Sequence, residues 1–268
     1  MSHVRLALIG TVAVLVLLAI SLPHMRAMDG HAVAVADSDS RIPVLVELFT
    51  SEGCSSCPPA DALLERLDRS QPVSGAELIV LSEHVDYWND IGWKDPFSSH
   101  EYSERQSAYA AQFGLGSIYT PQIVVDGHFE LVGSDERRAT QAIERATKVR
   151  KIPVSISLTD ERMTTVHIET GPLPPAIPAE SASVFLAIAD NSDESHVSRG
   201  ENAGRTLKHV AVLRDLVPVG TVGRTDKFSR DVAVNLNKGN RRDLRIMAII
   251  QEPPAGRVWG VGLARLSN

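Results

Sequence analysis

Two cysteines separated by two residues are the part of the sequence best suited to chemistry. Cys54 and Cys57 enclose Ser55-Ser56 and are the only cysteines among the 268 residues. A disulfide that closes so small a loop adds little stability by the chain-entropy argument. We therefore interpret the pair as a redox-active dithiol. Cys54 is the expected attacking thiolate, and Cys57 the sulfur that resolves a mixed disulfide.

A strand and a helix are expected to flank these cysteines. Residues 42–49 are a short apolar run typical of a buried strand. After Pro58-Pro59, apolar residues follow the i, i+3, i+4, i+7 spacing of one helix face, namely Ala60, Leu63, Leu64 and Leu67. Prolines are tolerated only in the first turn, so the helix is expected to begin near Cys57, with Cys54 in the preceding loop. The pair should then lie at an exposed helix start, where backbone N–H groups stabilise a thiolate.

Further elements follow in a regular order. A second apolar run at 77–83 predicts another strand, and Ser98 is expected to cap a helix that ends at Gly114. The dipeptide Asp126-Gly127 predicts a hairpin between strands at 122–125 and 129–132, and a last helix is expected over 134–149. The order is β-α-β, α, β-β-α, with the dithiol between the first strand and the first helix.

Four segments carry a family resemblance: VELFTSEGCSSCPPAD (46–61), HVDYWNDIGWKDPF (84–97), YTPQIVVDG (119–127) and RGENAGRTLKH (199–209). Through them the chain resembles the thioredoxin superfamily and, more narrowly, a secreted bacterial family of unknown function (domain of unknown function 1223). The resemblance implies a thioredoxin-like domain over residues 41–150. It also implies that Thr120 faces the dithiol and that a cis peptide bond joins it to Pro121.

The segment 84–97 follows the second expected strand and is rich in aromatic and acidic residues. One interpretation is a lip over the dithiol, with His84 as proton acceptor or metal ligand. The other is a loop whose aromatic rings fill the core and whose aspartates face water. Topology also places Glu52 and Glu83 near the dithiol, where either carboxylate could relay protons.

The second half of the chain, residues 152–268, loses helical periodicity. Its apolar runs are short and separated by turn residues, at 154–158, 165–169, 183–189, 232–236 and 244–251. Such spacing favours an all-β, sandwich-like C-terminal domain. The stretch 199–209 is polar enough to face solvent or the first domain, and its charges are expected to be a solvated face more often than a site.

The N-terminus predicts export. Arg5 precedes an uncharged apolar run from Leu6 to Leu22, and Ala34-Val35-Ala36 offers the small residues that a signal peptidase prefers. Residues 1–36 are therefore expected to be a signal peptide or, if uncleaved, a membrane anchor. In either case the protein is extracytoplasmic, in the periplasm or secreted.

Charge and motifs exclude several classes of function. The formal net charge is −6, and removing residues 1–36 would make the chain one unit more negative. That balance argues against nucleic acid or an anionic membrane surface as the main partner. The sequence has no phosphate-binding loop, no Ser-His-Asp signature, no zinc-ligand spacing and no internal repeat.

The function expected from these observations is an extracytoplasmic thiol–disulfide oxidoreductase. It would act on protein or small-molecule thiols and disulfides and would need no cofactor. One alternative is a copper-binding protein, because Cys54, Cys57 and His84 offer two soft sulfurs and an imidazole to Cu(I). Another is an interaction module that keeps the fold without turnover.

Overall fold

The computed structural model describes residues 41–158, 165–234 and 243–266. Its helices are α1 (Pro58–Ser70), α2 (His100–Phe113) and α3 (Glu136–Ala146). Its strands are β1 (Ile42–Thr50), β2 (Ala76–His84), β3 (Gln122–Val125), β4 (Phe129–Val132), β5 (Val154–Leu158), β6 (Thr165–Thr170), β7 (Ser181–His196), β8 (Thr206–Gly223), β9 (Phe228–Ala233), β10 (Leu244–Gln251) and β11 (Val258–Leu266). The expected leader, residues 1–36, lies outside the described residues. Within them, no helix is long and apolar enough to cross a bilayer.

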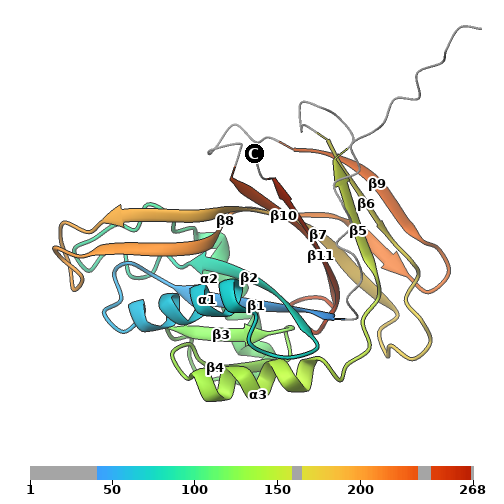
Figure 1. Cartoon of the computed structure of the whole chain (residues 1–268), viewed down its shortest axis with the longest axis horizontal. Helices are drawn as coiled ribbons and strands as arrows, with labels where there is room; N and C mark the ends of the chain where they lie inside the picture. The colour runs from blue at the N-terminus through green and yellow to red at the C-terminus, as the bar shows by residue number, and fades with distance from the viewer. Residues whose placement is uncertain (1–40, 159–164, 235–242, 267–268) are drawn as a thin grey trace, which may run out of the picture. The chain divides into compact units, whose positions relative to one another are not determined.

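The fold is mixed α/β around a large central sheet. This sheet has eight strands in the order β11-β10-β7-β8-β2-β1-β3-β4, and a second sheet has the order β5-β6-β9 (Figure 1). Strand β1 pairs with β2 in parallel and with β3 antiparallel. The carboxyl ends of β1 and β2 therefore lie together, with Thr50 opposite His84 in the register. The loops that leave these two ends carry the cysteines and the segment 84–97.

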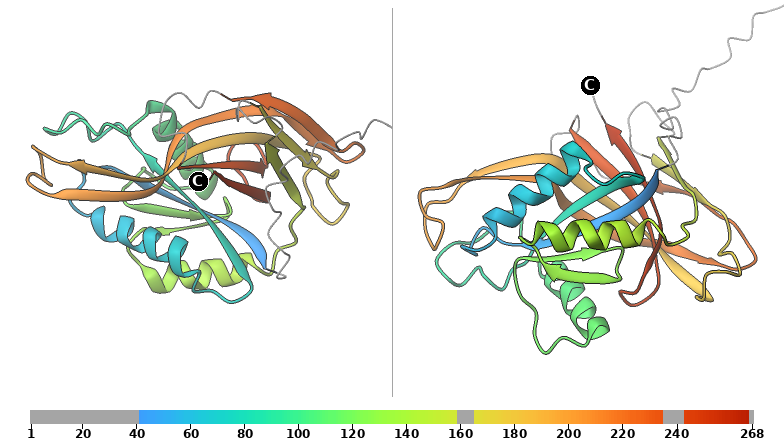
Figure 2. Two further views of the ribbon diagram at one scale, coloured as in Figure 1. Left: turned by 45° about the horizontal axis from the view of Figure 1, so that its top comes forward. Right: turned by 60° about the horizontal axis from the view of Figure 1, so that its bottom comes forward.

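Successive apolar side chains of β1 point to opposite faces of the sheet, so both faces can be covered by helices. Val46 and Leu48 lie in the apolar cluster that also contains the buried residues of α1 and α3. Leu45 points to the other face, where its cluster includes Tyr102 of α2. Figure 2 shows α1 and α3 on the same side of the sheet. The period-two pattern of this strand thus fixes which helix meets which face.

The caps and turns of the first half agree closely with the sequence. The hairpin predicted at Asp126-Gly127 joins β3 to β4, and both residues have positive φ. Gly114 ends α2 in the left-handed conformation, as expected. The N-cap of that helix is Ser99 and not the expected Ser98: the Ser99 side chain accepts a hydrogen bond from the Glu101 amide, whereas the Ser98 hydroxyl donates to the Asp95 carbonyl.

The second half contributes most of its strands to the same sheet as the first. Strands β7, β8, β10 and β11 continue the large sheet, which is joined through the parallel pairing of β8 with β2. The sheet therefore crosses the boundary expected at residues 150–152. Strands β5, β6 and β9 form the small sheet, whose apolar side chains cluster with those of β7 and β10. Strands β8 and β11 are not among the five expected runs.

Candidate functional site

The two cysteines form a disulfide at the start of α1, in the loop that follows β1. Cys57 is the N-cap of the helix, with the two prolines in its first turn. Cys54 lies in the preceding loop, where its amide bonds the Ser51 carbonyl and its own carbonyl accepts from the Cys57 amide. The predicted helix start and the predicted loop position of Cys54 are thus both confirmed. The prolines explain the geometry, because they provide no N–H to extend the helix backwards.

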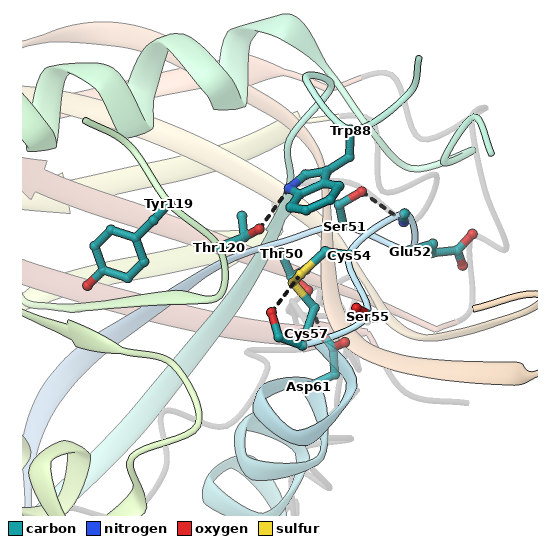
Figure 3. The surroundings of a disulfide bond; sticks show 12 residues. Thr50, Ser51, Glu52, Cys54, Ser55, Cys57, Asp61, Trp88, Tyr119 and Thr120 are labelled. Carbon is teal, nitrogen blue, oxygen red and sulfur yellow. Dashed lines mark hydrogen bonds between the residues drawn. A yellow bond between two sulfur atoms is a disulfide. The ribbon is translucent and has the colours of Figure 1, made fainter. Parts of the chain in front are cut away.

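The disulfide is buried, contrary to the exposed helix start that the sequence suggested. Cys54 and Cys57 are 0% exposed, although Ser55 and Ser56 between them face solvent. Trp88 provides part of the cover, and Figure 3 shows its ring beside Cys54. A Cβ atom placed on Gly53 would lie 3.0 Å from the Cβ of Trp88, so the tryptophan packs directly on the cysteine loop.

Thr120 and Pro121 form the next wall of the site. The peptide bond between them is cis, as the resemblance implied. The indole Nε1 of Trp88 donates a hydrogen bond of 2.8 Å to Thr120 Oγ1 (Figure 3). Pro121 approaches the first turn of α1, since a Cβ on Gly133 would contact both Pro121 and Ala60 at about 3 Å. Trp88 therefore links the cysteine loop to the turn that was predicted to face it.

A buried charged network lies beneath the cysteine loop. Glu52 Oε1 lies 3.2 Å from His209 Nε2 and also accepts from Ser195 Oγ. His209 Nδ1 lies 3.7 Å from Asp61 Oδ1, one helical turn after Cys57. Thr50 Oγ1 donates to the same Asp61 oxygen at 2.9 Å. The imidazole of His209 thus sits between two carboxylates, one from the cysteine loop and one from α1.

The charged groups of this network shift one another's pKa values in favour of the ionised forms. Burial alone would lower the pKa of His209, but the carboxylate of Asp61 at 3.7 Å and the carboxylate of Glu52, which accepts a hydrogen bond from the ring, raise it to about 10. Burial would likewise raise the pKa of Glu52, yet hydrogen bonds from His209, Ser195 and Trp93 leave that pKa below its ordinary value. We infer that His209 is an imidazolium and Glu52 a carboxylate at neutral pH.

His84 belongs to the same buried network. Its Nδ1 lies 2.7 Å from Asp95 Oδ2, and the same oxygen accepts a 2.8 Å hydrogen bond from the Glu52 amide. Its ring packs edge-on against that of His209, with centroids 4.6 Å apart. Burial opposes ionisation of Asp95, but the charge and hydrogen bond of His84 leave the pKa of Asp95 below its usual value. His84 Nε2 is buried and has no hydrogen-bond partner among the described residues.

The segment 84–97 covers the cysteine loop and anchors the charged network beneath it. Trp88 covers the disulfide, whereas Trp93 Nε1 donates to Glu52 Oε2 at 2.7 Å and so anchors the network. The aspartates were expected to face water, but Asp95 is buried because it holds His84 and the Glu52 amide. Glu83, expected near the dithiol, points to the opposite face of the sheet, 3.5 Å from Arg105 of α2.

The stretch 199–209 reaches the cysteine loop from the turn between β7 and β8. The side-chain amide of Asn202, which is 0% exposed, donates to the carbonyl oxygens of Glu52 at 2.9 Å and Cys54 at 3.0 Å. Glu201 Oε2 accepts a 3.0 Å hydrogen bond from the Ser55 amide. Of the two expectations for this stretch, contact with the first domain is the one confirmed for Asn202 and His209, which are buried against the cysteine loop. The polarity of the segment was the sequence feature that marked these residues. Their contacts with Glu52 and Cys54, some 150 residues earlier, could not be derived from it.

Metal binding has little geometric basis in the described part of the chain. It contains no group of three or more His, Cys, Asp and Glu side chains placed to hold a metal ion. His84 directs one ring nitrogen to Asp95, and both sulfurs are engaged with each other. The arrangement suits reversible two-electron chemistry between the sulfurs, next to fixed charges.

Comparisons with known proteins agree with this arrangement at the level of fold and family. A family model described as "Protein of unknown function (DUF1223)" matches residues 45–251. A crystal structure of protein AGR_C_4864 from Agrobacterium tumefaciens is 27% identical with a TM-score of 0.67, covering 84% of this chain and 94% of that one. HBP35 of Porphyromonas gingivalis is 14% identical with a TM-score of 0.61, covering 84% and 76% of the two chains, and shows the fold alone. No curated protein matches the sequence.

Proposed function

The chain belongs to the family of proteins of unknown function DUF1223, and from this premise we propose that it is an extracytoplasmic thiol–disulfide oxidoreductase. The single observation that carries the proposal is the Cys54–Cys57 disulfide at the N-terminus of α1, linked through Trp88 to Thr120. A structural disulfide of such short span would contribute little stability. A reversible one needs the neighbouring helix start and polar groups that this site has.

The order of elements supports a thioredoxin-like assignment for residues 41–150. Strand β1, helix α1 and strand β2 form a parallel β-α-β unit, and the hairpin β3–β4 with α3 completes it. The site lies at the carboxyl end of β1, where ligands of such sheets bind. We also propose that the strands after residue 152 serve this site, because β8 provides His209 and the turn before it provides Asn202.

The proposed reaction exchanges one disulfide for another. The Cys54 thiolate attacks a sulfur of the substrate disulfide, forms a mixed disulfide and releases one substrate thiolate, which takes a proton. The Cys57 thiolate then attacks the Cys54 sulfur, which releases the second substrate thiol and leaves the Cys54–Cys57 disulfide. Two electrons pass to the substrate, and an external thiol or dithiol restores the reduced pair. Run in reverse, the same steps oxidise a substrate dithiol.

The environment would assist these steps in two ways. The backbone N–H groups at the start of α1, where Cys57 is the N-cap, would favour a thiolate on the cysteines. Asn202 fixes the backbone at Cys54, which keeps the loop in one geometry. Since both sulfurs are buried, attack on the disulfide requires Trp88 to move aside.

The copper-binding alternative receives less support from the arrangement of donors. His84 directs Nδ1 to Asp95 and packs against the ring of His209. These contacts place it in the buried charged network and give no sign that it binds a metal together with the cysteines. A non-catalytic interaction module would leave the fixed charges next to the disulfide without a role. We therefore propose no metal cofactor, and protein or small-molecule thiols and disulfides as partners.

The test is reduction of a model disulfide by the wild-type chain and its cysteine variants. We expect turnover in the presence of dithiothreitol above the uncatalysed rate, lost on Cys54→Ser. Cys57→Ser should instead trap a mixed disulfide that intact mass detects. Cys54→Ser activity equal to wild type would overturn the proposal. As a control, Ser55→Ala changes an exposed side chain between the cysteines and should keep turnover.

A further inference from the structure

A hollow at the opposite end of β1 from the cysteines is not used by the proposed reaction. Its volume is about 560 Å³, within the range of small-molecule sites. It is bordered by the β3–β4 turn, the residues after α3, the loop 176–178 and the turn between β10 and β11. Because Asp126 of the β3–β4 turn bonds the backbone of Leu45, the hollow lies near the start of β1, whereas Cys54 follows its end.

The hollow is rich in positive charge on an acidic protein. Lys148, Arg150 and Arg257 line it together with His128, against the single carboxylate of Glu252. Within the part of the chain that the structure describes, none of the three cations forms an ion pair. The whole chain has a formal charge of −6, so this grouping differs in sign from the average surface. Unpaired cations around a hollow attract an anion.

Trp259 forms a further wall of the hollow and holds one of its cations. Trp259 lines the hollow and is 5% exposed, and its Nε1 has no hydrogen-bond partner among the described residues. That nitrogen is closed off from solvent, so Trp259 borders the hollow through its other atoms. The guanidinium of Arg257 lies 5.2 Å from the centroid of the Trp259 ring, which keeps the cation in place.

The walls of the hollow are fixed before any ligand binds. The Glu252 amide bonds the Arg257 carbonyl, and the Val258 amide bonds the Asp126 carbonyl across the two turns. Lys151 also connects the two turns: its Nζ lies 2.8 Å from Asp126 Oδ2 and donates to the Val258 carbonyl at 2.7 Å. Fixed walls reduce the ordering cost of binding.

We propose that this hollow binds a small organic anion, a carboxylate or phosphate attached to a compact apolar body. Arg257, Arg150 and Lys148 meet the charged group. Ile177 and Pro178 supply the apolar wall for the rest of the ligand. The proposal is independent of the oxidoreductase activity.

Titration calorimetry of the full chain with three related probes tests this site. Phenyl phosphate combines both features, inorganic phosphate keeps only the charge, and phenol keeps only the ring. We expect saturable binding of phenyl phosphate that weakens as salt is raised, weaker binding of inorganic phosphate and none of phenol. Equal binding of phenol would overturn the anion site, and equal binding of inorganic phosphate would overturn the organic class.

Variants locate the binding. Lys148→Gln with Arg150→Gln changes two exposed side chains and should weaken phenyl phosphate binding by about tenfold or more, since two positive charges that meet the anion are removed. Lys227→Gln, which removes a cation paired with Glu169 on the small sheet, is the matched control and should bind as wild type. Absence of saturable binding, or equal affinity in the double variant and the control, would refute the site.

Discussion

Asn202 lies 148 positions after Cys54 in the sequence, and its side-chain amide donates a 3.0 Å hydrogen bond to the Cys54 carbonyl oxygen. The same amide also donates to the Glu52 carbonyl, and the Asn202 side chain is fully buried. One residue of the second half therefore fixes the backbone of the cysteine loop at two points.

Asn202→Ala should destabilise the oxidised protein by about 1–3 kcal/mol, because the carbonyl oxygens of Glu52 and Cys54 each lose a buried hydrogen bond. Urea unfolding monitored by circular dichroism measures the change. Glu201→Gln is the matched control, since Glu201 is exposed and accepts one hydrogen bond from the Ser55 amide. Its cost should stay below about 0.5 kcal/mol. Equal losses in the two variants would contradict the assigned role of Asn202.

Trp88→Ala should speed chemical reduction of the disulfide by dithiothreitol by about tenfold, because the thiolate can attack only a sulfur that it can reach. Thr120→Val keeps the shape of the side chain but removes the acceptor of the Trp88 hydrogen bond. It should give a smaller acceleration, and Trp88→Phe should behave similarly. Rates are followed by quenched alkylation and mass spectrometry. If Trp88→Ala is reduced no faster than wild type, the tryptophan does not control access.

Protonation of His209 should make the free energy of unfolding depend on pH above neutrality. An unfolded histidine has a pKa near 6.5, whereas that of His209 in the fold is about 10. A raised pKa in the fold means that its stabilisation is complete below pH 6.5 and is lost as pH rises towards 10. Urea unfolding at pH 6, 7, 8 and 9 should therefore show falling stability in the wild type and a flatter profile in His209→Gln. Parallel profiles would show that His209 is not charged in the fold.

Gly127→Ala should be far more destabilising than Gly114→Ala. Both glycines have φ between 60° and 70°, so alanine meets similar backbone strain at either site. At Gly127 the added Cβ would also overlap the backbone carbonyl of Gly256, whereas nothing lies within 4 Å of a Cβ at Gly114. Thermal unfolding of the two variants should differ by at least about 1–2 kcal/mol. Equal losses would show that the two turns can separate without cost.

The sequence by itself determined the local structure of the first half. Periodicity and turn residues act over a few positions, so they predicted the strand before Cys54, the helix start at Cys57 and the turn at Asp126-Gly127. The family resemblance, and not local pattern, supplied the cis bond before Pro121.

Only the tertiary structure decided what surrounds the disulfide. Burial of the sulfurs under Trp88, the pairing of His209 with Glu52 and the insertion of Asn202 all depend on strand pairing between distant segments. A polar stretch such as 199–209 has the same composition whether it faces water or completes a site. The difference arises because β8 pairs with β2, and this long-range pairing brings the turn before β8 onto the cysteine loop.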